Sequence, residues 1–128
     1  MKLKYLISYL LALNLGVTFM SCNQADPNLR TQACFTTQHH NQIIPNIAVY
    51  VKFDAIDFPG YDNFNQFNLM QTSDRNGRVC FNDIPLGNHW FVAIGYDEEI
   101  REQVIGNIDI RFDLSNLRID QILYVGEE

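Results

Sequence analysis

The clearest pattern along this chain is an alternation of apolar and charged residues near its C-terminal end. Residues 108–114 read IDIRFDL, so four apolar side chains at every second position are separated by three charged ones. Successive side chains of a β-strand point to opposite faces. A period of two therefore predicts a strand with one buried face and one solvated face.

Similar alternation recurs in short segments along the chain. We predict further strands at residues 31–38, 48–53, 67–72, 78–82, 89–96 and 118–125, which makes seven in all. Turn residues separate these segments, and no segment with helical spacing is long enough to compete with them. Seven short strands in one small domain predict an all-β fold, a seven-stranded Greek-key-type β-sandwich.

Two turn motifs enclose the short strand at residues 78–82. Residues 74–77 read DRNG and fit a type I turn in which Gly77 takes a positive φ. Residues 84–87 read IPLG, with proline at the second turn position and glycine at the fourth. The DRNG segment also begins like a calcium loop, but Pro85 stands at the twelfth position, where an EF-hand needs glutamate. The pattern therefore favours a plain turn.

The order of three segments resembles a known domain family. PNIAVYVKF, TSDRNGRVCF and IPLGNHWFVAIGY follow one another as they do in carboxypeptidase regulatory-like, or transthyretin-like, domains. The segments FPGYD at 58–62 and GYD at 95–97 also resemble those of small bacterial lipoproteins built on that fold. The resemblance covers residues 31–125 and implies a transthyretin-like β-sandwich. Because its motifs are turn chemistry, it implies a fold and carries no activity with it.

The first 21 residues have the layout of a secretory leader. Lys2 and Lys4 precede an apolar run from about residue 5 to residue 20, and a small residue stands before Cys22. The run is shorter than the ~20 apolar residues that a membrane-spanning helix needs. The ending FMSC resembles the lipobox of bacterial lipoproteins, which implies acylation of Cys22, with palmitate among the acyl chains. We therefore expect a signal peptide at 1–21, a lipidated tether at 22–30 and the β-sandwich domain at 31–128.

The charge of the chain limits its partners. The sequence holds 9 basic and 15 acidic residues, a net charge of −6, and removal of the leader would take away two of the basic ones. This acidity argues against nucleic acid and against electrostatic docking on anionic lipid. We expect membrane attachment through the acyl chains on Cys22. The resemblance to Gram-negative lipoproteins favours the outer membrane, with the domain facing the periplasm or exposed on the surface.

Two cysteines remain besides Cys22. Cys34 and Cys80 both fall in predicted strands, and export would allow a disulfide between them. The alternative is that both are small buried apolar residues. The sequence leaves the two alternatives open.

No set of residues indicates catalysis or a metal. His39, His40 and His89 are the only histidines, and we expect the adjacent pair to point to opposite sides of a strand or turn. Zinc needs three or four convergent ligands. A G-x-S-x-G motif is absent, and Ser73 and Ser115 lie in turn-like surroundings. We predict a protein that is not an enzyme and has no metal or cofactor.

The strand at 89–96 is apolar on both faces, so something must cover its second face. Trp90, Val92 and Ile94 alternate there with Phe91 and Ala93. We favour coverage by the loop at residues 55–66, which contains four large apolar residues. The alternative is an exposed aromatic patch for a partner. In either case the candidate binding surface consists of three aromatic residues, Tyr61, Trp90 and Tyr96.

These observations predict a non-enzymatic, membrane-anchored envelope lipoprotein that acts as a protein-binding or assembly module. The expected partner is another envelope protein. The alternative function is binding of a carbohydrate or small ligand on the aromatic loop, because sugar rings stack on aromatic side chains. A deep site holding Tyr61 and Trp90 would favour a sugar, and a flat apolar patch would favour a protein.

Overall fold

The structure is a computed structural model that describes residues 29–128. The predicted signal peptide, the lipidation site Cys22 and the tether up to residue 28 lie outside the described residues. Within residues 29–128, no helix has the length and apolarity needed to cross a membrane.

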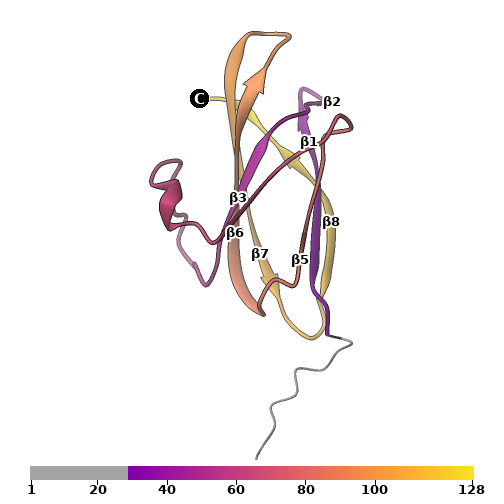
Figure 1. Ribbon diagram of the computed structural model, residues 1–128, viewed down its shortest axis with the longest axis vertical. Coiled ribbons are helices and arrows are strands. Elements are labelled where there is room, and N and C mark those ends of the chain that lie inside the picture. Colours follow the sequence, from indigo (N-terminus) through magenta and orange to yellow (C-terminus); the bar gives the residue numbers. More distant parts are fainter. Residues whose placement is uncertain (1–28) are drawn as a thin grey trace, which may run out of the picture.

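Two β-sheets pack face to face in the described chain (Figure 1). The first sheet is centred on β1 (Gln32–His39), with β5 (Arg78–Asn82) antiparallel on one side, β8 (Arg118–Tyr124) parallel on the other, and the short β2 (Gln42–Ile43) in a hairpin with β1. The second sheet has the order β4 (Leu69–Thr72), β3 (Ala48–Lys52), β6 (Gly87–Asp97), β7 (Glu102–Phe112), β9 (Gly126–Glu127). The predicted all-β sandwich is confirmed.

All seven predicted strands are present, with differences at their ends. The two-residue strands β2 and β9 are additional, and a short 3-10 helix, η1 (Phe64–Gln66), lies in the loop after β3. The alternating segment belongs to a longer strand, since β7 starts at Glu102 and ends at Phe112. It ends there because Asp113 Oδ1 accepts the backbone N–H of Ser115 at 2.9 Å, which starts a turn and leaves Leu114 exposed.

The inner faces of the two sheets form one hydrophobic core. Phe35 and Phe81 of the first sheet contact Phe91 of the second, with ring centroids 4.8 and 5.7 Å apart. Each fully buried side chain of this size contributes roughly 1.5–3 kcal/mol relative to exposure. The period-two pattern of the sequence therefore gives the sandwich its main source of stability.

The predicted turn at residues 74–77 is present and has the expected geometry. The Gly77 N–H donates to the Asp74 carbonyl oxygen at 2.9 Å, and Gly77 has a φ of +69°. Asp74 Oδ1 also accepts the backbone N–H groups of Asn76 and Arg78, at 2.8 and 2.9 Å. These bonds fix the corner between β4 and β5.

The described chain enters at one end of the sandwich, beside the β5–β6 and β7–β8 connections (Figure 1). The opposite end, here called the distal end, is formed by residues 39–42, 97–102 and 126–128. It carries the β1–β2 turn, the β6–β7 hairpin turn and strand β9. The two ends hold different chemistry.

Candidate functional site

The loop between β3 and β4 lies against the outer face of the second sheet. Trp90 Nε1–H donates to the Ile56 carbonyl oxygen at 3.2 Å, and the Phe58 ring meets the Trp90 ring edge-on at 5.2 Å between centroids. Asn107 on β7 donates through Nδ2 to the Tyr61 hydroxyl. The favoured arrangement, in which this loop covers Trp90, is the one that the structure has.

The second half of the loop covers the neighbouring strand. Phe64 of η1 packs on Tyr50 of β3 with ring centroids 4.2 Å apart, and Phe67 meets the same ring at 5.8 Å. Val92, beside Tyr50 on the outer face, is fully buried as a result. The aromatic residues of this loop therefore pack within the protein, as a second, smaller apolar layer.

The three aromatic residues predicted as one binding surface do not form one. Tyr61 and Trp90 are linked through Phe58, whereas Tyr96 lies six residues farther along β6, about 20 Å from Trp90 at the usual rise of a strand. Tyr96 is 47% exposed at the distal end. Sequence alternation put Trp90 and Tyr96 on the same face, but the distance along the strand separates them.

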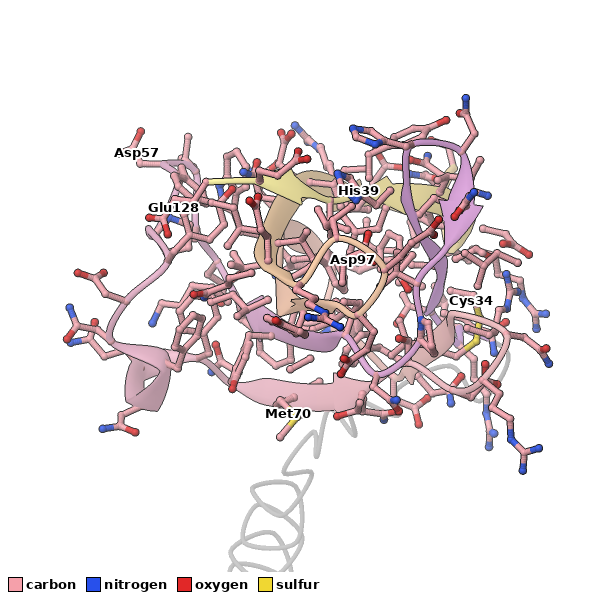
Figure 2. The ribbon with its side chains drawn as sticks, turned by 90° about the horizontal axis from the view of Figure 1, so that it is seen from above. Cys34, His39, Asp57, Met70, Asp97 and Glu128 are labelled. Atoms are coloured by element: carbon pink, nitrogen blue, oxygen red, sulfur yellow. A yellow bond between two sulfur atoms is a disulfide. The ribbon has the colours of Figure 1, made fainter. Side chains whose placement is uncertain are left out.

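Part of the outer face of the second sheet stays open beyond the loop. Ala48, Ile94 and Ile105 lie directly opposite one another on β3, β6 and β7 and are only partly buried. Met70, opposite Tyr50 on β4, is 53% exposed and projects away from the sandwich (Figure 2). We call this row together with Tyr96 and Met70 the open apolar face.

The strand beside the open apolar face is an edge of its sheet. β4 pairs with β3 on one side, and all four of its residues, LMQT, are exposed. Edge strands in native proteins commonly carry charges or proline that block pairing with another chain. Strand β4 carries neither, and Leu69 and Met70 add apolar surface to it.

The outer face of the first sheet is cross-linked. Cys34 of β1 and Cys80 of β5 lie opposite each other with Cα atoms 4.1 Å apart, and their side chains form a disulfide. Arg78 of β5 reaches across β1 to Asp120 of β8 in a two-pronged ion pair of 2.6 and 2.8 Å. Its hydrogen bonds hold the pKa of the Asp120 carboxyl below the ordinary value. A disulfide therefore links β1 to β5 on this face, and an ion pair links β5 to β8.

A histidine and two carboxylates meet at the distal end. His39 is only 3% exposed; its Nδ1 lies 2.7 Å from Asp97 Oδ2 and its Nε2 lies 3.1 Å from Glu127 Oε2. The hydrogen bond with Asp97, followed by that with Glu127, raises the pKa of His39 against the opposing effect of burial. The same bond with His39 lowers the pKa of Asp97. Figure 2 looks down on this end and shows His39 and Asp97 close together over the middle of the sandwich.

The expectation that His39 and His40 point to opposite sides is wrong. The strand ends between them, and His40 and Asn41 take left-handed backbone conformations with φ of +47° and +63°. The chain therefore folds back, and the His40 ring stacks on the His39 ring with centroids 4.0 Å apart. His40 Nε2 lies 3.9 Å from Glu127 Oε1. The sequence offered one signal for this, the Asn41 that follows, since asparagine tolerates a left-handed turn.

His89 is buried near the opposite end and has different partners. Its Nδ1 accepts the backbone N–H of Asp54 at 3.1 Å, and its Nε2–H donates to the Pro85 carbonyl oxygen at 2.6 Å. Both nitrogens are used by the backbone, so His89 connects two loops and presents no free ligand atom.

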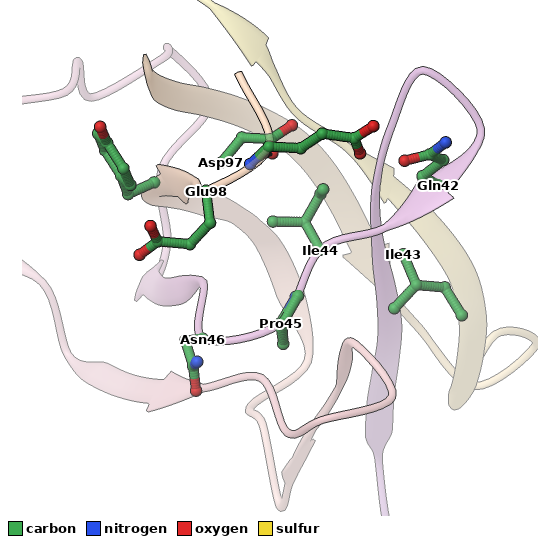
Figure 3. Close-up of a pocket in the computed structure, with 9 residues that line it drawn as sticks. Gln42, Ile43, Ile44, Pro45, Asn46, Asp97 and Glu98 are labelled. Atoms are coloured by element: carbon green, nitrogen blue, oxygen red, sulfur yellow. Dashed lines mark hydrogen bonds between the residues drawn. The ribbon is translucent and has the colours of Figure 1, made fainter. Parts of the chain in front are cut away.

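A pocket of about 280 Å³ adjoins the histidine cluster. It lies between the segment at residues 42–46 and the end of β6, and Asp97, Glu98 and Glu99 form its acidic side (Figure 3). Two further pockets in the described part of the chain are lined by residues 30–32, 82–83 and 114–118. None of these three pockets includes Tyr61 or Trp90, so none of them supports the carbohydrate alternative.

Comparisons with known proteins give the fold. No family model matches the chain, and no curated protein matches it. Among solved structures, it is similar to the crystal structure of the major pilin subunit of Bacillus cereus, with a TM-score of 0.51 and 13% sequence identity. The match covers 76% of this chain and 30% of that chain, so this chain spans less than a third of the pilin. The likeness shows a shared β-sandwich fold, and the finer resemblance to carboxypeptidase regulatory-like domains stays a prediction.

Proposed function

We propose that this protein is a non-enzymatic, membrane-anchored envelope lipoprotein whose β-sandwich binds another envelope protein along strand β4 and the open apolar face. The observation that carries the proposal is the free edge of β4, four exposed residues without charge or proline. An extended segment of a partner can add to such an edge through main-chain hydrogen bonds. The neighbouring apolar row would then receive its side chains.

The shape of this surface supports a protein over a sugar. The half of the sheet face near Trp90 is occupied by the protein's own loop, and the Trp90 indole N–H is already bonded to Ile56. The open half is apolar and bordered by Tyr96, a residue type that is enriched at interfaces. That the similar solved structure is a pilin subunit agrees with a role in protein assembly.

The anchoring part of the proposal is supported by the sequence at residues 1–22. Acyl chains on Cys22 would hold the protein on the bilayer, each contributing ~0.8 kcal/mol per buried methylene group. The described chain begins at the end of the sandwich opposite the distal end (Figure 1). A tether there would point the distal end away from the membrane.

The test is capture of the partner from detergent-solubilised envelope by the tagged full-length protein, followed by comparison of variants. Met70→Lys places a charge on the exposed side of β4, and we expect it to weaken capture by at least the ~2 kcal/mol typical of a central contact. Leu114→Lys is the matched control, because Leu114 is 72% exposed in the β7–β8 connection, far from β4. Capture of the same protein by wild type and by both variants would refute the role of β4.

A further inference from the structure

We propose that His39, His40 and Glu127 form a binding site for a divalent transition-metal ion of the zinc type at the distal end. The two imidazoles and the carboxylate each offer one ligand atom, and these atoms lie within 4.8 Å of one another. Nothing in the proposed binding along β4 requires this site.

The distances approach those around a small ion, and the His40 ring has to turn out of its stack on His39 for both Nε2 lone pairs to face that ion. His39 Nε2 lies 3.1 Å from Glu127 Oε2, and His40 Nε2 lies 3.9 Å from Glu127 Oε1. Bonds of ~2.0–2.2 Å at tetrahedral angles place ligand atoms roughly 3.3–3.5 Å apart. The side chains of His40 and Glu127 are 72% and 42% exposed, so both are free to make this rotation and the smaller adjustment of the carboxylate.

Asp97 gives His39 the orientation that a metal ligand needs. When a metal occupies Nε2, the Nδ1–H of His39 donates to the Asp97 carboxylate, which is 2.7 Å away and only 5% exposed. Metal-binding histidines almost always have such a partner behind the ring, since it fixes the tautomer and makes the ligand more basic. Asp97 is itself held by the Glu99 backbone N–H at 3.0 Å. It is therefore a positioning residue.

An ion pair alone does not account for the arrangement. His39 between Asp97 and Glu127 is already fully hydrogen-bonded, yet the left-handed turn at His40 brings a second imidazole onto the same carboxylate. Strand β9 holds Glu127 in place by pairing it with Val104 of β7. Three segments distant in the sequence thus converge on one point.

The ligand types and the surroundings select the class of ion. Two nitrogen ligands favour zinc, nickel or copper, because calcium and magnesium take oxygen ligands. Glu98 and Glu99 follow Asp97 in the turn between β6 and β7, and their charge attracts cations. Three protein ligands leave one coordination position for water or for a group of another molecule.

Zinc binding to the purified full-length protein tests the proposal. At pH 7.5 we expect calorimetry with ZnCl₂ to show one Zn²⁺ per chain and a thermal melt to shift upward as zinc is added. His40→Ala and Glu127→Gln change exposed side chains, so both variants should fold. Each should lose ~10–100-fold or more in zinc affinity, because removal of a residue that only hydrogen-bonds to a metal ligand already costs that much. Glu128→Gln is the matched control and should bind as the wild type does.

A nitrogen-15 spectrum of the imidazoles locates the ion. Zinc should shift the signals of His39 and His40, with His39 bound at Nε2 and protonated at Nδ1, and leave those of His89 in place. Absence of saturable binding, or affinity unchanged in both His40→Ala and Glu127→Gln, would overturn the proposal. Shifts confined to other residues would overturn it as well.

Discussion

The outer face of the second sheet has two halves that look alike in sequence and differ in structure. The half around Trp90 and Tyr50 is covered by the β3–β4 loop, which leaves Val92 fully buried. The half around Ile94 and Ile105 is partly exposed and ends at the free edge of β4. An apolar second face of a strand therefore does not by itself indicate a binding surface, because the protein's own loop covers half of this face.

The covered half should behave as core. Trp90→Ala removes a half-buried ring that packs on Phe58 and donates to Ile56, and we expect a loss of about 2–4 kcal/mol, somewhat below that for a fully buried aromatic. Urea unfolding measures it. A loss under about 0.5 kcal/mol would place Trp90 with ordinary surface residues and break the distinction between the halves.

The Asp74–Gly77 corner leads from β4, the edge of the open half, into β5. Gly77→Val should cost about 1–3 kcal/mol, because Gly77 has a φ of +69° and a Cβ there would lie 3.0 Å from the Thr37 carbonyl oxygen. Gly126→Ala is a control, since a Cβ at Gly126 meets nothing within 4 Å. Equal stability of the two variants in urea would show that the corner is not held as described.

The His39 cluster adjoins the open half, because Asp97 follows Tyr96 on β6, and it should make stability depend on pH. The pKa of His39 is raised above 6.5, so its contribution is complete below pH 6.5 and is lost as the pH rises through the raised pKa. The pKa values of Asp97 and Glu127 are lowered, so their contributions are lost only as the pH falls through the lowered values. The cluster should stabilise most between about pH 4.5 and 6.5.

Metal-free melts from pH 5 to pH 9 check this. Wild type should lose stability above pH 6.5, and His39→Gln should lose the same component at all pH values, so that its own curve is flatter in that range. Parallel curves for the two proteins would contradict the assignment. His40, Asp97 and Glu127 are the titratable groups that contact His39 from the β1–β2 turn, β6 and β9.

The smallest effect on stability is expected at the free edge of β4, which borders both halves. Met70→Lys changes a side chain that is 53% exposed on an edge strand, so the free energy of unfolding should change by less than about 0.5 kcal/mol. A loss of stability close to that expected for Trp90→Ala would mean that the Met70 side chain stabilises the fold. Weaker capture of the partner by Met70→Lys would then result from unfolding of the variant.

The sequence predicted the parts of this account that depend on local patterns. Alternation located seven strands, the DRNG segment located a turn, and the apolar-rich loop at residues 55–66 was correctly assigned to Trp90. The sequence did not predict the features that depend on contacts between distant segments. His39 and Glu127 are 88 residues apart and meet only because β9 pairs with β7.

The candidate site was harder to predict from the sequence for the same reason. The left-handed turn at His40 places its ring on His39, and alternation alone predicts the opposite. The free edge of β4 follows from the strand order β4-β3-β6-β7-β9, which no property of the segment LMQT reveals. Fold class depends on periodicity within segments, whereas a surface depends on which segments become neighbours.

Amide hydrogen exchange on the captured complex tests the central claim most directly. If a partner strand adds to the sheet, backbone amides in residues 69–72 should exchange more slowly in the complex than in the free protein, while those in residues 55–66 keep their rates. Slower exchange confined to residues 55–66, with β4 unchanged, would contradict the account and move the binding surface to the aromatic loop.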